Sequence, residues 1–140
     1  MATSALPLSP RSASSTAGLL PLVGRILIAT IFLLSSLSKL TAPSATIGYI
    51  ASAGLPAPTL AYGVALATEL GGGLLLVLGY RTRLVAAALA VFAIATALGF
   101  HHDFADQNQF THFFKNLAMA GGLLQVVAFG GGALSVDARR

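Results

Sequence analysis

The amino-acid sequence predicts an all-α membrane protein, a bundle of four transmembrane helices with both termini in the cytoplasm. Apolar residues make up 56% of the chain, whereas only 9% are charged. A soluble domain carries about 25% charged residues, so this chain lacks the charge to cover a surface in water. Its mean hydropathy of +0.84 points the same way. Four apolar runs, at about 19–40, 58–78, 84–100 and 110–129, are each close to the length that spans a bilayer.

The segments between these runs define the expected organisation. Residues 1–17 are rich in Ala, Ser and Pro and predict a flexible tail, which lacks the basic start of a secretory signal. One membrane domain follows over 18–136, and 137–140 form a short C-terminal tail. Within the domain, 41–57 reads as a loop with a short interfacial helix. Strands are not expected, because the runs lack period-2 alternation and open sheet edges cannot face lipid.

Basic residues predict the orientation. With four spans, one side of the membrane holds both tails and the second linker, and with them Arg11, Arg81, Arg83, Arg139 and Arg140. The positive-inside rule places that side in the cytoplasm. The net charge of +4 is then an orientation signal, and without a Lys/Arg-rich block it predicts no nucleic-acid site. The chain contains no cysteine, which excludes disulfides and thiolate metal or redox sites.

Glu69 lies inside the second apolar run, where an ionisable residue costs about 2.5 to 3.5 kcal/mol on insertion scales. Its helical neighbours are Ala65, Gly72 and Gly73, small residues that let another helix approach. We therefore expect Glu69 on a packing face. Counted from the same side of the membrane, the depth of Arg25 in the first run differs from that of Glu69 by roughly 5 Å, at a helical rise of 1.5 Å per residue. An Arg25–Glu69 ion pair is the prediction, either as a structural pair that fixes helix register or as part of a proton or ligand site.

Other polar residues form candidate groups. Lys39 and Lys115 lie at the outer ends of the first and fourth spans, either as site residues or as side chains that reach the headgroups. One helical stripe and one polar turn are predicted: Arg25, Ala29, Phe32, Ser36 and Lys39 in the first run, and His112, Lys115 and Asn116 in the fourth. The third run carries no ionisable residue and is expected to face lipid. A further group has metal-ligand residue types without a zinc-like spacing, so a solvated loop is favoured over a metal site: His101, His102, Asp103, Asp106 and His112.

Several motifs occur together and in order: GRILIATIFLLSSLSKL, YIASAGLP, ATELGGGLLLVLGYRTR, HFFKNLAMAGGLL and GALSVDARR. Over about Leu19 to Arg139 they resemble the DoxX family of small bacterial membrane proteins. The resemblance implies a four-helix protein of the bacterial cytoplasmic (inner) membrane, associated in some members with quinone-linked redox enzymes. Many members carry an oxidoreductase label without an assigned reaction. The residues matching the family pattern are Arg25, Ser38, Lys39, Glu69, Gly71 to Gly73, His112, Lys115 and Asn116.

Two hypotheses for function remain open on the sequence. In the first, the protein is a quinone-linked redox protein or subunit of an oxidoreductase complex. Lys39, His112, Lys115 and Asn116 would bind the ligand, Glu69 would relay a proton, and electrons would come from a soluble redox partner or a reacting substrate, because the chain has no cofactor motif of its own. In the second, it is a non-enzymatic membrane scaffold or small-molecule carrier that docks a soluble partner. Glycine-rich faces make a homo-oligomer compatible with both.

Overall fold

The computed structural model describes residues 14–140, with side chains from Gly18 onward. This range forms five α-helices and no strand: α1 (Ser14–Thr41), α2 (Pro43–Ser52), α3 (Pro58–Leu78), α4 (Thr82–Phe100) and α5 (Gln107–Phe129), followed by a short 3₁₀ turn η1 (Asp137–Arg139). The all-α prediction is confirmed. Most of the predicted N-terminal tail lies outside the described residues. Helix α1 begins at Ser14, so the last residues of the predicted tail, 14–17, belong to the helix.

The helix ends follow from local sequence. Pro43 and Pro58 occupy the first turns of α2 and α3, where the missing N–H of proline costs nothing. Gly79 ends α3 in the left-handed conformation with φ +70°, which glycine adopts without strain. Asp106 caps α5 through its carboxylate, which accepts hydrogen bonds from the backbone N–H groups of Asn108 and Gln109.

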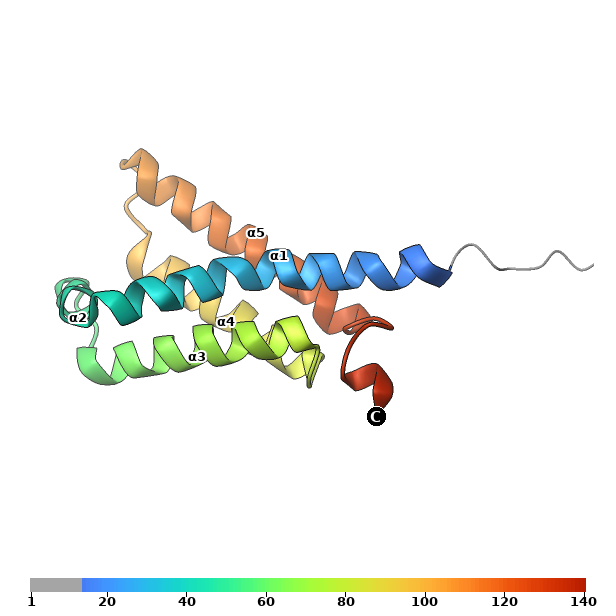
Figure 1. Ribbon diagram of the computed structural model, residues 1–140. Helices are drawn as coiled ribbons and strands as arrows, with labels where there is room; N and C mark the ends of the chain where they lie inside the picture. Colours follow the sequence, from blue (N-terminus) through green and yellow to red (C-terminus); the bar gives the residue numbers. More distant parts are fainter. Residues whose placement is uncertain (1–13) are drawn as a thin grey trace, which may run out of the picture.

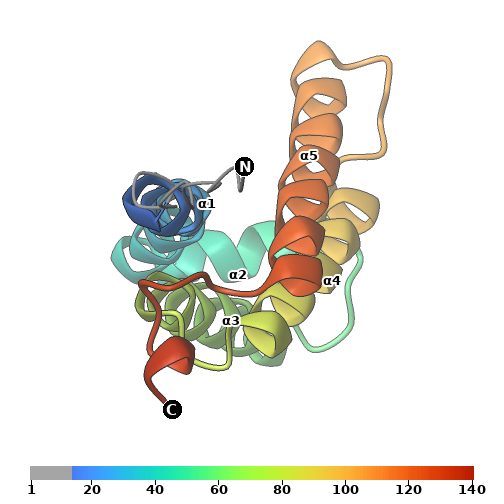
Figure 2. The ribbon, with the colours of Figure 1, turned by 90° about the vertical axis from the view of Figure 1, so that its right-hand side faces the viewer.

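The helices form two packed pairs. Helices α1 and α3 lie side by side and antiparallel, and α2 closes the end where α1 stops and α3 starts (Figure 1). Helices α4 and α5 form the second pair, and α4 packs on α3. Helix α5 crosses α1 at an oblique angle (Figure 1), and Figure 2, which looks nearly along α1, shows its first half extending away from α1. The two helices contact each other only near the crossing and diverge towards the polar end of α5.

Three helices have the length and composition of membrane spans: Gly18–Thr41, Pro58–Leu78 and Thr82–Phe100. Helix α5 is 23 residues long, but it is less apolar because its first half contains QNQ, a histidine and a lysine. The described residues therefore contain three candidate spans where the sequence predicted four.

Small residues let the helices approach closely. A Cβ atom on Gly72 would lie 2.9 Å from Leu89 of α4, and one on Gly73 would lie 2.8 Å from Leu33 of α1, so the glycine triplet packs α3 against both neighbours, as predicted. The predicted stripe of α1 also faces inward, since Arg25, Ala29, Phe32 and Ser36 are buried.

The prediction that the third apolar run forms the lipid-facing wall misses its central packing, although one side of this helix does expose Leu84, Val91 and Leu98. Helix α4, which corresponds to that run, contributes more buried residues than any other described helix: Thr82, Val85, Ala86, Leu89, Ala90, Ala93 and Ala97. The alanines give it a narrow face that fits between α3 and α5. The lack of charged side chains along most of α4 therefore accompanies central packing on one side of this helix.

The C-terminal segment folds back onto the turn between α3 and α4. The Asp137 carboxylate accepts hydrogen bonds from the backbone N–H groups of Arg81 and Thr82 and from the Thr82 hydroxyl, at 2.7 to 2.8 Å. These donors hold the pKa of the Asp137 carboxyl below its ordinary value, the Thr82 bonds most strongly. Asp137 therefore acts as a cap for α4 supplied from the other end of the chain.

Candidate functional site

Glu69 is buried in the membrane domain and paired with Lys39. Lys39 Nζ lies 2.9 Å from Glu69 Oε2 and donates a hydrogen bond to Oε1 at 3.1 Å. Ser35 links the two groups, because its hydroxyl donates to Oε1 at 3.2 Å and lies 2.7 Å from Lys39 Nζ. The Glu69 side chain is 6% exposed and that of Lys39 is 21% exposed. The carboxylate is thus neutralised by a cation from α1 that still reaches the surface.

The predicted Arg25–Glu69 ion pair is wrong. The Arg25 guanidinium donates to the carbonyl oxygens of Leu76, Val77 and Leu134 at 2.7 to 3.0 Å. The first two belong to the last turn of α3, where carbonyls lack helical partners and the helix dipole favours a cation. Helix register explains the error: Arg25 lies opposite a point roughly two turns beyond Glu69, about 12 Å along the helix at 1.5 Å per residue.

Four of the predicted site residues meet in one small cavity. A pocket of about 230 Å³ between α1, α4 and α5 is lined by Glu69 from α3 and by His112, Lys115 and Asn116 from α5. Lys115 Nζ lies 2.7 Å from His112 Nδ1, within hydrogen-bond distance. Asn116 is buried and donates to the His112 carbonyl oxygen at 3.1 Å. We refer to this cavity as the inner chamber.

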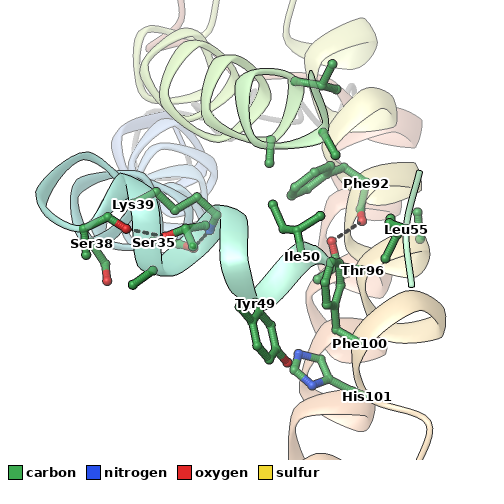
Figure 3. A pocket seen from close by; sticks show the side chains of 17 residues that line it. Ser35, Ser38, Lys39, Tyr49, Ile50, Leu55, Phe92, Thr96, Phe100 and His101 are labelled. Carbon is green, nitrogen blue, oxygen red and sulfur yellow. Dashed lines mark hydrogen bonds between the residues drawn. The ribbon is translucent and has the colours of Figure 1, made fainter. Parts of the chain in front are cut away.

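A larger pocket of about 690 Å³ lies next to it, between α1, α2, α3 and α4. We refer to it as the main pocket. Apolar side chains make most of its wall, and Figure 3 shows Lys39 and Ser35 on one side with Tyr49, Phe100 and His101 gathered at another. Tyr49 stacks on Phe100 with ring centroids 5.4 Å apart. The full lining is Ser35, Ser38, Lys39, Ala42, Ala45, Thr46, Tyr49, Ile50, Leu55, Ala61, Val64, Ala65, Phe92, Ala95, Thr96, Phe100 and His101.

Comparison with known proteins identifies the family. A model of the DoxX family matches residues 20–102. The chain is 37% identical over 116 residues to the inner membrane protein YqjF of Escherichia coli K12, covering 83% of this chain and 88% of that protein. It is 34% identical over 124 residues to the inner membrane protein YphA of the same organism, covering 84% and 88%. The chain belongs to the DoxX family. No solved structure matches it.

The DoxX match separates the site into two parts. Lys39, Glu69 and His101 fall inside the matched residues, whereas His112 and Lys115 follow them. The two E. coli relatives are matched over more than four fifths of this chain. The family assignment, together with three long apolar helices, makes this chain an integral membrane protein.

The polar segment after α4 forms no metal site in residues 14–140, where no three His, Asp or Glu side chains stand together as ligands. Asp106 is used as the α5 cap, and the Asp103 carboxylate accepts from the Ala105 backbone N–H. His101 instead stacks on His112 with ring centroids 5.1 Å apart. Burial, followed by the charges of His112 and Lys115, lowers the pKa of His101, which favours its neutral form.

Two residues of this DoxX site, Ser35 and Phe92, were not singled out from the sequence, and His101 was considered only as a member of the group with metal-ligand residue types. Ser35, Phe92 and His101 line both cavities and so form the wall between them. Ser35 is one helical turn before Lys39, which was a signal in the sequence, because i and i+4 residues share a face. Phe92 gave no such signal, since an aromatic residue within an apolar run fits any packed helix.

Proposed function

We propose that this DoxX-family protein is a quinone-linked redox protein, or the membrane subunit of an oxidoreductase complex, that binds a quinone in the main pocket. The observation that carries the proposal is the pocket itself: about 690 Å³ with mainly apolar walls and a few polar groups beside a buried ion pair. Cavities of this size with a small number of convergent polar groups are typical ligand sites.

The residues present fit a quinone. The apolar walls suit a ring and an isoprenoid tail, and a quinone carbonyl needs a hydrogen-bond donor. The Ser38 and Tyr49 hydroxyls and the His101 ring line the pocket and form no side-chain hydrogen bond within the described residues. They are therefore available as donors, whereas Lys39 is already engaged with Ser35 and Glu69.

The chemistry that a quinone supplies is acceptance of two electrons and two protons. This chain provides no electron carrier by motif, so the electrons come from a soluble redox partner or from the substrate itself. The role of the protein's own residues is to hold the ring and deliver protons. Glu69 is suited to that role because its carboxylate reaches the wall between the cavities, and Lys39 positions it through a direct contact of 2.9 Å.

We further propose that the protein lies in the bacterial inner membrane with both termini in the cytoplasm and α5 as a fourth span. Both relatives named above are inner membrane proteins. Helix α5 has 23 residues, or about 34 Å at 1.5 Å per residue, and its exposed side chains include Phe110, Leu117, Leu124 and Phe129. The basic turn at Arg81 and Arg83 lies at the same end as the C-terminus (Figure 1).

The test begins with purification in native lipid, extraction of bound small molecules and identification by mass spectrometry. We expect quinone at close to one per chain. Ala95→Trp, which fills the main pocket from α4, should deplete it, whereas Leu84→Trp, three turns earlier at an exposed position of the same helix outside the pocket lining, should not.

Other outcomes refute the redox proposal. Equal quinone content in both variants would show that the lipid phase and not the pocket holds the quinone. A soluble partner that copurifies without any enriched small molecule would favour a membrane scaffold, and a saturable flux across proteoliposomes would favour a carrier. Unchanged quinone reduction by the Glu69→Gln variant would remove the relay role.

A further inference from the structure

The inner chamber differs from the main pocket in size and chemistry. It measures about 230 Å³, a third of the volume of the main pocket, which corresponds to roughly eight waters at 30 Å³ each. Its lining includes the polar side chains of His101, His112, Lys115 and Asn116, and Glu69 contributes from α3. Polar cavities of this size in proteins hold ordered water, whereas apolar ones stay dry.

Glu69 has an acceptor that the chain does not satisfy. Oε1 accepts from Ser35 and Lys39. Oε2 lies 2.9 Å from Lys39 Nζ, but the angles are poor and it accepts no hydrogen bond from the described residues, although it is fully buried. Leaving such an atom unpaired costs about 1 to 3 kcal/mol or more for a charged group. A donor inside the adjoining chamber relieves that cost, and water is the donor that fits.

The charged and titratable groups around Glu69 come from three elements. Helix α1 supplies Lys39, helix α5 supplies His112 and Lys115, and the segment after α4 supplies His101. Lys115 is exposed, and within residues 18–140 no carboxylate lies at salt-bridge distance from it. Lys115 therefore places a positive charge on the chamber lining, which disfavours metal cations and favours small anions.

We propose that the inner chamber is a water-filled proton inlet, through which Glu69 exchanges protons with the aqueous phase on the side of the α4–α5 segment while the main pocket stays open to lipid. Ser35, Phe92 and His101 separate the two cavities. The use of the delivered proton rests on the proposed function, but the access of water to Glu69 does not.

The absence of cysteine from the chain allows a direct test by single-cysteine labelling. Methanethiosulfonate reagents attack the thiolate, which forms in water and not in lipid or a dry core. Two variants place a thiol in the inner chamber: Met119→Cys on α5 and Ala93→Cys on α4. Two matched controls lie on the same helices, Leu124→Cys on an outward face and Ala97→Cys in the packed core at 0% exposure.

We expect Met119→Cys and Ala93→Cys to react at least ~10-fold faster than their controls, and only when the reagent is added on the side of the α4–α5 segment. A negatively charged reagent should react about fivefold faster than a positively charged one of similar size, because of Lys115. Lys115→Gln should abolish that preference.

Chamber thiols that react as slowly as the controls, or that react from the opposite side, would overturn the inlet. The measurement needs no quinone, so its outcome is independent of the proposed function. Water access with no quinone in the main pocket refutes the redox proposal and supports the inlet. Bound quinone with unreactive chamber thiols does the reverse.

Discussion

Removing Lys39 should destabilise the protein more than removing the charge of Glu69. In Lys39→Met the carboxylate of Glu69 stays buried, with only the Ser35 hydroxyl as partner. Breaking a buried pair on one side costs about 3 to 5 kcal/mol, and we expect the lower end, about 3 kcal/mol, because a fifth of the Lys39 side chain is exposed. In Glu69→Gln the remaining lysine can extend to the surface, and the loss should be about 1 kcal/mol.

Thermal unfolding in lipid nanodiscs, followed by far-ultraviolet circular dichroism, measures both effects. At roughly 2 to 4 °C per kcal/mol for a chain of this size, Tm should fall by roughly 6 to 12 °C in Lys39→Met and by roughly 2 to 4 °C in Glu69→Gln. A double-mutant cycle of these two changes should show a coupling above about 1 kcal/mol.

The control is the same cycle with Arg25→Gln in place of Lys39→Met. Its coupling with Glu69→Gln should be within about 0.5 kcal/mol of zero, as for residues that share no partner. The reverse result, with strong coupling to Arg25 and none to Lys39, would refute the geometry of the site and restore the pair that the sequence suggested.

Three other predictions concern the scaffold. Gly73→Leu should lower Tm by the equivalent of about 1 to 3 kcal/mol because its side chain collides with α1, whereas Gly71→Ala, which meets nothing within 4 Å, should leave Tm unchanged or slightly raised. Arg25→Lys should lower Tm, because one ammonium cannot reproduce a planar fork bonded to three carbonyl oxygens. The low pKa of Asp137 means that its cap stabilises the fold above the ordinary carboxyl pKa and is lost as pH falls through the folded value. The protection factors of the first α4 amides against hydrogen exchange should therefore fall in acid in the parent protein, and should already be low at neutral pH in Asp137→Ala.

The sequence predicted helices better than it predicted their neighbours. The apolar runs gave α1, α3 and α4 within a few residues, because length and hydrophobicity act within one segment. The structure brings His112, Lys115 and Asn116 together in the inner chamber, since they lie within one turn and so share a face. Packing order was not accessible in this way, and the alanine-rich α4 proved central although its lack of charge suggested a lipid-facing wall.

The incorrect Arg25–Glu69 pair shows why packing was harder to predict than helices. The expected depths were measured from the ends of the apolar runs, but α1 begins before its run, and its residues are offset from those of α3 by several positions. Two cations on one stripe of α1 could each meet Glu69, and hydrophobicity alone did not distinguish them. The deciding contacts are the carbonyls in the last turn of α3 and the carbonyl of Leu134, and the latter depends on where the C-terminal segment returns.

The buried charges of this DoxX protein therefore sort into two groups with different consequences. Arg25 bonds only to main-chain carbonyls, in a place where Asp137 and the C-terminal segment also close the fold, so its substitution should affect stability and leave ligand binding intact. Lys39 and Glu69 sit between two cavities of different polarity, and the buried Glu69 Oε2 has only its ion contact with Lys39 among the described residues. A pair required only for helix register would be better sealed on both sides. The position of this pair between a mainly apolar pocket and a polar chamber is the ground on which we propose a role in chemistry as well as in packing.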